Sequence, residues 1–119
     1  LAEEPAGDDA ARGAADGLAA AARPGGLLNT AFASRSEVLA GRMPGGAVGP
    51  YLSALLVGHE IAGAQALLGR SDTVHLVADG VLAQSYGAAL ASAGIEAKPT
   101  TPEAAFVAGV RRLAERVPA

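Results

Sequence analysis

The chain has 119 residues, which is enough for one domain but too few for two. Its formal net charge of −3 excludes the basic surface that nucleic-acid binding requires. The absence of cysteine excludes disulfides, thiolate metal sites and cysteine nucleophiles.

Residues 1–26 are predicted to form a flexible or weakly helical N-terminal segment. Residues 1–8 have a composition typical of disorder, and residues 9–23 are compatible with a helix but contain few large apolar side chains. The chain begins at Leu1 rather than at a methionine, so we expect a fragment of a longer protein. The first residues are acidic, which is unlike a secretory signal, and we expect a cytoplasmic protein.

The middle of the chain is predicted to be helical. Residues 27–42 carry apolar side chains at helical spacing and form one helix or two short ones, followed by a Gly- and Pro-rich loop over residues 43–50. Pro50 is expected to open a long helix from Tyr51 to Leu68, and Gly69 to end it. The composition of this helix indicates a buried helix of a soluble protein.

His59 and Glu60 interrupt the apolar sequence of the long helix. A membrane span rarely carries such a pair, and a zinc protease would need a second histidine where this chain has Gly63. We expect His59 to be half-buried and hydrogen-bonded to a backbone carbonyl group. Glu60 is harder to explain by structure alone, and we interpret it as a carboxylate that meets the hydroxyl groups of a ligand.

The second half of the chain predicts alternating strands and helices. A strand is expected over residues 73–78, a helix over 81–93 and a second strand over 95–98. Thr101 is expected to cap a last helix that reaches about Val117. This order predicts a parallel strand pair with a right-handed crossover.

Two parallel strands do not form a stable sheet by themselves, because such a sheet needs further strands and cover on both faces. The sheet therefore continues either in another chain or in sequence that precedes Leu1, and we favour the second explanation. The pair Asp79 and Gly80 follows the first strand, where ligands bind in open α/β folds. An ordinary turn between a strand and a helix is the alternative. The chain contains no phosphate-binding loop motif and no complete catalytic set.

The order of several segments resembles a known family. The segments "LLNTAFASR", "PYLSALLVGHEIAGA", "VHLVADGVLAQSYGAALASAGIEA" and "AAFVAGVRRLA" are similar to the C-terminal part of the 2-dehydro-3-deoxygalactonokinase family, a member of the actin-like, hexokinase-like ATPase superfamily. The resemblance spans residues 27 to about 114. It implies an α/β fold in which residues 27–119 form the helix-rich C-terminal portion of the second kinase lobe, a lobe of ribonuclease H-like type with a parallel β-α-β unit.

The resemblance also implies an activity. A kinase of this family transfers the γ-phosphoryl group of ATP, bound with Mg²⁺, to 2-dehydro-3-deoxy-D-galactonate. The phosphate-binding hairpins and the catalytic aspartate would precede Leu1, so we assign no catalytic and no metal-binding residue here and expect the fragment alone to be inactive.

The family pattern suggests residues for the nucleotide. Glu60 matches a glutamate that contacts the ribose, and Asp79, Gly80 and Val81 would line the adenine side. The superfamily often has paired glycines where this sequence has Asp79 and Gly80, which weakens the expected contact with the base. Arg35 is expected either to reach a phosphate or the sugar acid or to form a structural ion pair.

Two other interpretations stay open. The chain could be a non-catalytic α/β interaction module that completes its sheet by oligomerising, or part of another sugar kinase of the same superfamily. The partners implied are ATP and a small sugar acid, without nucleic acid or membrane, and a homo-oligomer remains open.

Overall fold

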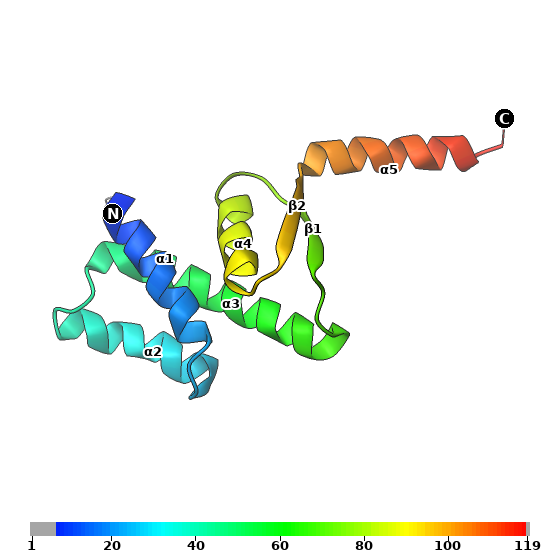
Figure 1. The fold of residues 1–119 in the computed structure, drawn as a ribbon. Helices are drawn as coiled ribbons and strands as arrows, with labels where there is room; N and C mark the ends of the chain where they lie inside the picture. Colours follow the sequence, from blue (N-terminus) through cyan, green and yellow to red (C-terminus); the bar gives the residue numbers. More distant parts are fainter. Residues whose placement is uncertain (1–6, 119) are drawn as a thin grey trace. The chain divides into compact units, whose positions relative to one another are not determined.

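The computed structural model describes residues 7–118, which divide into two compact units. The first unit reaches to Arg70 and the second begins at Ser71. Figure 1 shows the helices and strands of both units, and each unit is described by itself. The expected disorder of residues 1–8 falls mostly on residues 1–6, which lie outside the described part, whereas Asp8 already belongs to a helix.

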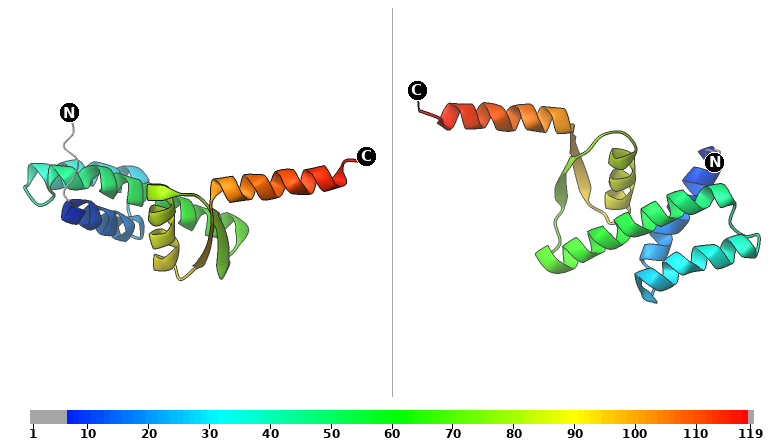
Figure 2. Two further views of the ribbon diagram at one scale, coloured as in Figure 1. Left: turned by 90° about the horizontal axis from the view of Figure 1, so that it is seen from above. Right: turned by 180° about the vertical axis from the view of Figure 1, so that it is seen from behind.

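The first unit consists of helices. They are α1 (Gly7–Ala21), α2 (Gly26–Leu39), the short 3-10 helix η1 (Gly45–Ala47) and α3 (Val48–Leu68). Both α1 and α2 pack on α3, and the views in Figure 2 show all three helices from two further directions. Of the two alternatives for residues 27–42, one helix or two short ones, the structure has the single helix α2. The long helix begins before Tyr51, so that Pro50 lies in its first turn, where a missing N–H group costs nothing.

Small residues hold α1 against α3. Gly13 and Gly17 are buried, and a Cβ atom added to them would collide with the backbone carbonyl oxygens of Ala47 and Tyr51. A Cβ atom on Gly58 would lie 2.6 Å from the Cβ atom of Ala21. The two helices therefore approach so closely that backbone atoms make the contact, which compensates for the lack of large side chains on α1.

This packing joins α1 to the other helices of the first unit. Helix α1 belongs to the same compact unit as α2 and α3, and that unit ends at Arg70. The boundary expected between residues 26 and 27 stays a prediction. The assignment of residues 27–119 to a second kinase lobe stays a prediction.

The core of the first unit is small and centred on α3. Tyr51 and Leu55 of α3 are buried together with Ala20, Met43 and Ala47. The hydroxyl group of Tyr51 donates a hydrogen bond of 2.9 Å to the backbone carbonyl oxygen of Thr30 in α2. Aliphatic, aromatic and alanine side chains thus bury one face of α3 between the other two helices.

The segment Gly45–Leu68 is long and apolar enough to cross a membrane by length and composition, and within residues 7–118 it alone meets that test. Its most apolar window has a mean hydropathy of 1.2. A core helix of a soluble protein meets the same criterion, and several α3 residues pack in the core described above. However, Leu56, Leu67 and Leu68 are exposed, so the predicted buried helix is buried along only part of its surface.

The second unit contains the predicted strand–helix–strand arrangement. Strand β1 (Thr73–Val77), helix α4 (Gly80–Ser92) and strand β2 (Glu96–Thr100) are followed by α5 (Pro102–Arg116). The strands are parallel, with Thr73 paired to Glu96 and Val77 to Thr100, which confirms the predicted parallel pair. The second strand extends two residues beyond the predicted end, through Pro99.

The N-terminus of α5 has the predicted cap. Thr101 is extended, and its side-chain oxygen accepts a hydrogen bond of 3.1 Å from the backbone N–H group of Ala104. Pro102 follows at the first helical position, where its fixed φ angle suits the helix.

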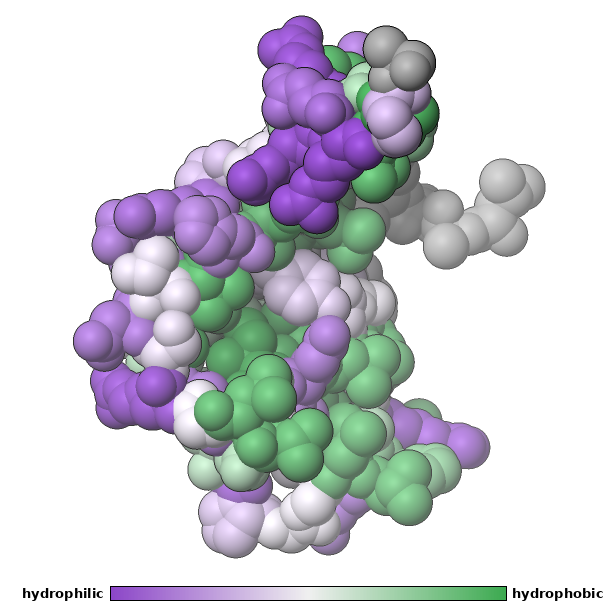
Figure 3. Space-filling view, turned by 90° about the vertical axis from the view of Figure 1, so that its right-hand side faces the viewer, coloured by the Kyte–Doolittle hydropathy of each residue, from purple (hydrophilic) through white to green (hydrophobic). Residues whose placement is uncertain are grey.

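The second unit leaves much apolar surface uncovered. Within the described residues its sheet has two strands, and no residue of α5 is buried. Phe106 is 72% exposed and Leu113 67%. Figure 3 shows one face of the whole described chain, on which hydrophobic areas lie beside hydrophilic ones. The fold is α/β and rich in helices, as expected. The actin-like lobe stays a prediction, and the uncovered surface is consistent with further structure packing against this unit.

Candidate functional site

The predicted site residues are divided between the two units. Glu60 lies on α3 of the first unit, whereas Asp79, Gly80 and Val81 lie where β1 ends and α4 begins in the second unit. The geometry of each group is therefore given within its own unit.

Glu60 lies on the exposed side of α3, between the half-buried His59 and the buried Ile61. The apolar sequence of α3 predicts a buried carboxylate, whereas Glu60 is exposed. The side chain faces outward because α3 buries only the face that α1 and α2 cover. Because Glu60 is exposed, a carboxylate at this position of α3 needs no special explanation. Its proposed contact with a ligand depends on the family resemblance alone.

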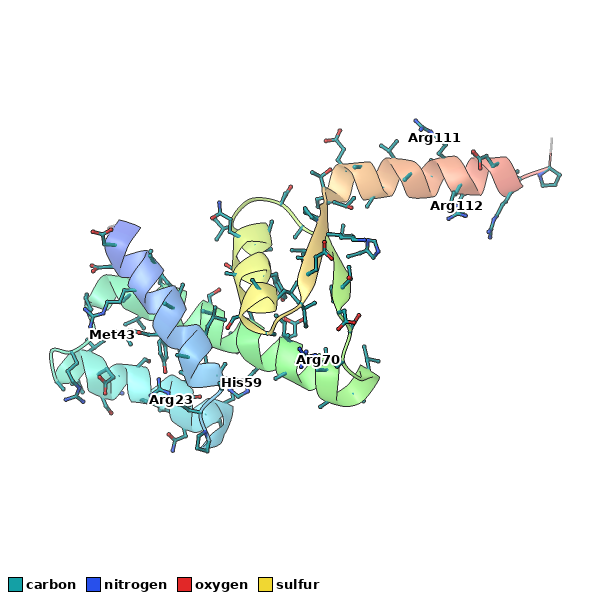
Figure 4. All side chains as sticks on the ribbon, in the orientation of Figure 1. Arg23, Met43, His59, Arg70, Arg111 and Arg112 are labelled. Atoms are coloured by element: carbon teal, nitrogen blue, oxygen red, sulfur yellow. The ribbon has the colours of Figure 1, made fainter. Side chains whose placement is uncertain are left out.

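His59 is half-buried, as predicted, but its expected hydrogen bond is not seen at Nε2. This atom is buried, and no described residue provides a hydrogen-bond partner for it. Figure 4 labels His59 on α3. A buried imidazole nitrogen without a partner costs stability, so His59 is a local weak point of the first unit.

The turn between β1 and α4 has an unusual N-cap. Asp79 occupies the N-cap position with extended backbone angles (φ −136°, ψ 173°), yet its side chain forms no capping hydrogen bond. Its backbone carbonyl oxygen accepts a hydrogen bond of 3.2 Å from the N–H group of Ala83. The carboxylate is exposed and does not satisfy the first N–H groups of α4, which are the groups that a ligand at a helix N-terminus would meet.

Gly80 and Val81 complete this turn. Gly80 has a φ angle of +54°, which favours glycine, and a Cβ atom added there would meet no other atom within 4 Å. Val81 is 77% exposed. The turn therefore combines open space beside the backbone with an apolar side chain and a carboxylate, and a flat heteroaromatic group could approach it.

The charged residues form few contacts within the described part of the chain. Arg42 pairs with Glu37 through two hydrogen bonds of 2.8 and 2.9 Å. The hydrogen bond from Arg42 lowers the pKa of Glu37 below its ordinary value. Arg35, for which an ion pair was the alternative to ligand binding, forms no ion pair with a described residue.

Neither the Glu37–Arg42 pair nor the close contact of α1 was predicted from the sequence. The pair is separated by five residues and joins the end of α2 to the following loop, outside the usual helical spacing of three or four. The glycines of α1 did give a signal, because Gly13 and Gly17 recur after four residues and therefore lie on one helix face.

No metal site is evident in residues 7–118, where no three His, Asp or Glu side chains come together. At the C-terminal end, Arg111 and Arg112 extend from opposite sides of α5, as Figure 4 shows. The two guanidinium groups therefore do not converge on one anion. Both are exposed, like the rest of this helix.

Comparison with known proteins connects the chain to one family. It is 30% identical, over 91 residues, to the 2-dehydro-3-deoxygalactonokinase of Escherichia coli (strain K12). The match covers 76% of this chain but only 31% of that protein, so the chain spans about a third of its relative's length. No solved structure matches significantly. The model of the 2-keto-3-deoxy-galactonokinase family matches residues 1–113, and the chain belongs to this family.

Proposed function

We propose that the chain is the C-terminal part of an ATP-dependent kinase that phosphorylates 2-dehydro-3-deoxy-D-galactonate in the cytoplasm. The observation that carries the proposal is the family match over residues 1–113, which includes every described helix and strand except the end of α5. The name of the Escherichia coli relative points to the same substrate. The exposed apolar surface of the second unit supports a role as part of a larger enzyme.

The turn between β1 and α4 is proposed to hold the adenine side of ATP. Open space beside Gly80 allows a ligand to approach the backbone, and Val81 offers an apolar surface for the base. The carboxylate of Asp79 is not used for capping, so it remains available to accept hydrogen bonds. These properties fit a nucleotide base better than a phosphate group, which the nearby carboxylate would repel.

Glu60 is proposed to accept hydrogen bonds from the ribose hydroxyl groups. An exposed carboxylate with two acceptor oxygens suits a vicinal diol. This role comes from the family resemblance, and the exposure of Glu60 is compatible with it.

The described residues do not supply the phosphoryl-transfer chemistry. Such transfer depends on Mg²⁺, on groups that neutralise the phosphates and on a residue that orients the attacking hydroxyl. The described part of the chain contains no converging metal ligands, and the proposal assigns Mg²⁺ to none of its residues. Its contribution is to position the nucleoside and to take part in the closure that excludes water.

The proposal is tested by kinetics on the full-length protein that carries this chain. ADP release is measured with ATP and Mg²⁺ in the presence of 2-dehydro-3-deoxygalactonate, and the C-4 epimer 2-dehydro-3-deoxygluconate serves as the matched control. We expect a higher kcat/KM with the galactonate derivative. A preference for another sugar acid would assign the chain to a different sugar kinase, and the absence of turnover with any sugar acid would overturn the kinase assignment.

Residues 1–119 alone are expected to show no turnover in the same assay. A stable oligomer of this chain whose melting temperature does not rise with ATP would instead favour a non-catalytic module. The open edges of the two-stranded sheet are the observation behind that second interpretation.

A further inference from the structure

The two edges of the sheet differ in the backbone groups that they offer to a further strand. In a strand, the N–H and C=O groups of one residue point to one side, and those of the next residue point to the other side. The N–H group of Glu96 donates a hydrogen bond of 2.9 Å to the carbonyl oxygen of Asp72, and that of Ala78 donates one of 3.3 Å to Thr100. The even-numbered residues of β1 and β2 therefore face the other strand. The odd-numbered residues turn their backbone groups to the outer edges.

The outer edge of β2 cannot continue a ladder of hydrogen bonds. Pro99 lies at an outward position and has no N–H group, which is a property of edge strands. The N–H group of Ile95, just before the strand, already donates to the end of α4 at 2.9 Å. The carbonyl oxygen of Thr101, just after the strand, accepts a hydrogen bond of 3.0 Å from the first turn of α5. Among the described residues of this edge, Ala97 alone keeps both groups available, and one residue does not hold a neighbouring strand.

The outer edge of β1 is open along its second half. The carbonyl oxygen of Thr73 accepts a hydrogen bond of 2.8 Å from the hydroxyl group of Ser71, which occupies the start of this edge. His75 and Val77 turn both their N–H and their C=O groups outward, and no described strand pairs with them there. From this contrast we infer that β1 is an interior strand of the complete sheet, and that β2 is its outer edge. A strand from the rest of the full-length protein pairs with His75 and Val77.

The small number of open groups indicates that this strand belongs to the same polypeptide. Two residues offer four backbone groups, and each hydrogen bond contributes little net free energy. A second copy of the chain would lose its translational and rotational freedom for these few bonds, whereas a strand of the same polypeptide would not. The chain spans only 31% of its Escherichia coli relative, so a full-length protein of that size has room for further strands.

The order of the strands also affects the turn that follows β1. If β1 is an interior strand, Asp79 and Gly80 lie beside another strand rather than at the rim of the sheet. Ligands of open α/β folds bind outside the carboxyl ends of neighbouring strands. This arrangement does not depend on which ligand the turn binds, so the strand order and the nucleotide site can be tested separately.

Amide hydrogen exchange of the full-length protein, followed by NMR, tests the strand order. The N–H groups of Val74 and Leu76 point toward β2, so they are protected in either case and serve as the reference. We expect the N–H groups of His75 and Val77 to exchange on the order of a hundredfold more slowly than that of Ala97 on the outer edge of β2. Fast exchange at His75 and Val77, or equal protection at Ala97, would overturn the inference. Protection that weakens when the protein is diluted would mean that a second copy supplies the strand, and it would contradict the inference as well.

Proline substitutions in the full-length protein give a second measurement. His75→Pro removes an outward N–H group of β1 and Ala97→Pro one of β2, and neither removes a hydrogen bond between the two strands. We expect His75→Pro to lower the melting temperature by several degrees more than Ala97→Pro, because an interior strand loses a ladder bond. His75→Ala, which keeps the N–H group, controls for the loss of the imidazole. A His75→Pro chain that does not fold, beside a folded Ala97→Pro chain, would agree with this expectation. Equal losses, or a larger loss for Ala97→Pro, would contradict the assignment of β2 as the outer edge.

Discussion

The hydroxyl group of Tyr51 in α3 donates a buried hydrogen bond of 2.9 Å to the backbone carbonyl oxygen of Thr30 in α2. Thr30 is itself buried, and its own hydroxyl group donates to carbonyl oxygens of the preceding helical turn. The contact links residues separated by 21 positions in the sequence. It fixes the rotation of α2 on α3 and thereby determines which face of α2 remains outside.

Tyr51→Phe tests this contact. The substitution keeps the aromatic ring in the core but removes the donor, so the free energy of unfolding should fall by about 1 kcal/mol. The measurement is urea denaturation followed by circular dichroism. Ser36→Ala, at an exposed position of α2, is the control and should change stability by less than about 0.5 kcal/mol. An unchanged midpoint for the Tyr51 variant would show that the hydrogen bond does not contribute.

Gly17→Ala tests the backbone contact between α1 and α3. The added methyl group would lie against the carbonyl oxygen of Tyr51 and 3.0 Å from the Cβ atom of Ala54. Because backbone atoms cannot move aside easily, we expect a loss of about 1–3 kcal/mol in unfolding free energy. This loss should occur although alanine favours helix formation by about 1 kcal/mol over glycine.

Gly63→Ala is the matched control for that substitution. Gly63 also lies inside a helix, but a Cβ atom there would meet no other atom within 4 Å. We expect this variant to gain about 0.5–1 kcal/mol, since only the helix propensity changes. If both variants shift stability in the same direction, close packing is not what positions α1.

These glycines also show where sequence reasoning reached its limit. The alternation of residues 73–77, the cap at Thr101 and the end of the long helix at Gly69 are local signals, and the structure confirms them. The stability of α1 in the folded chain could not be predicted from the composition of α1 itself. The stability of α1 depends on the close approach of Gly13 and Gly17 to the backbone of Ala47 and Tyr51, which exists only in the folded chain.

Glu60 shows a second limit. Because α3 is apolar on nearly all sides, its sequence has no polar face that shows which side meets solvent, and the pattern predicts a buried carboxylate. The structure shows Leu56, Leu67 and Leu68 exposed as well. Apolar residues that this chain leaves exposed cannot be distinguished by pattern from those it buries. The positions of Asp79 and Gly80 at the end of a strand, by contrast, followed from local order alone.

The Glu37–Arg42 pair leads to a prediction about pH. The hydrogen bond from Arg42 lowers the pKa of Glu37 in the folded state, so the pair stabilises the fold above the ordinary glutamate pKa. This contribution is lost as the pH falls through the lowered value. NMR titration of the Glu37 side chain should give a midpoint below the ordinary glutamate pKa, and Arg42→Ala should raise it toward that ordinary value. A midpoint that does not respond to Arg42→Ala would contradict the pairing, and high salt should weaken the effect.

The proposed nucleotide turn is tested at Gly80 in the full-length enzyme. Its φ angle of +54° is unfavourable for other residues, and the space beside it is open. Gly80→Val should therefore raise the KM for ATP and leave the KM for the sugar acid nearly unchanged. Gly87→Ala, within α4 and without a positive φ angle, is the control and should alter neither constant. Equal effects on both substrates would point to general damage of the fold rather than to a base site.

The proposed ribose contact of Glu60 is tested with two nucleotides. ATP carries the 2′-hydroxyl group and 2′-deoxy-ATP lacks it, so the full-length enzyme should lose about tenfold in kcat/KM with the deoxynucleotide, as expected for a charged hydrogen bond. Glu60→Gln should lower kcat/KM for ATP by a similar factor and remove most of the difference between the two nucleotides. Glu103→Gln, at the exposed start of α5, should preserve the difference. If Glu60→Gln retains full discrimination, the carboxylate does not contact the ribose.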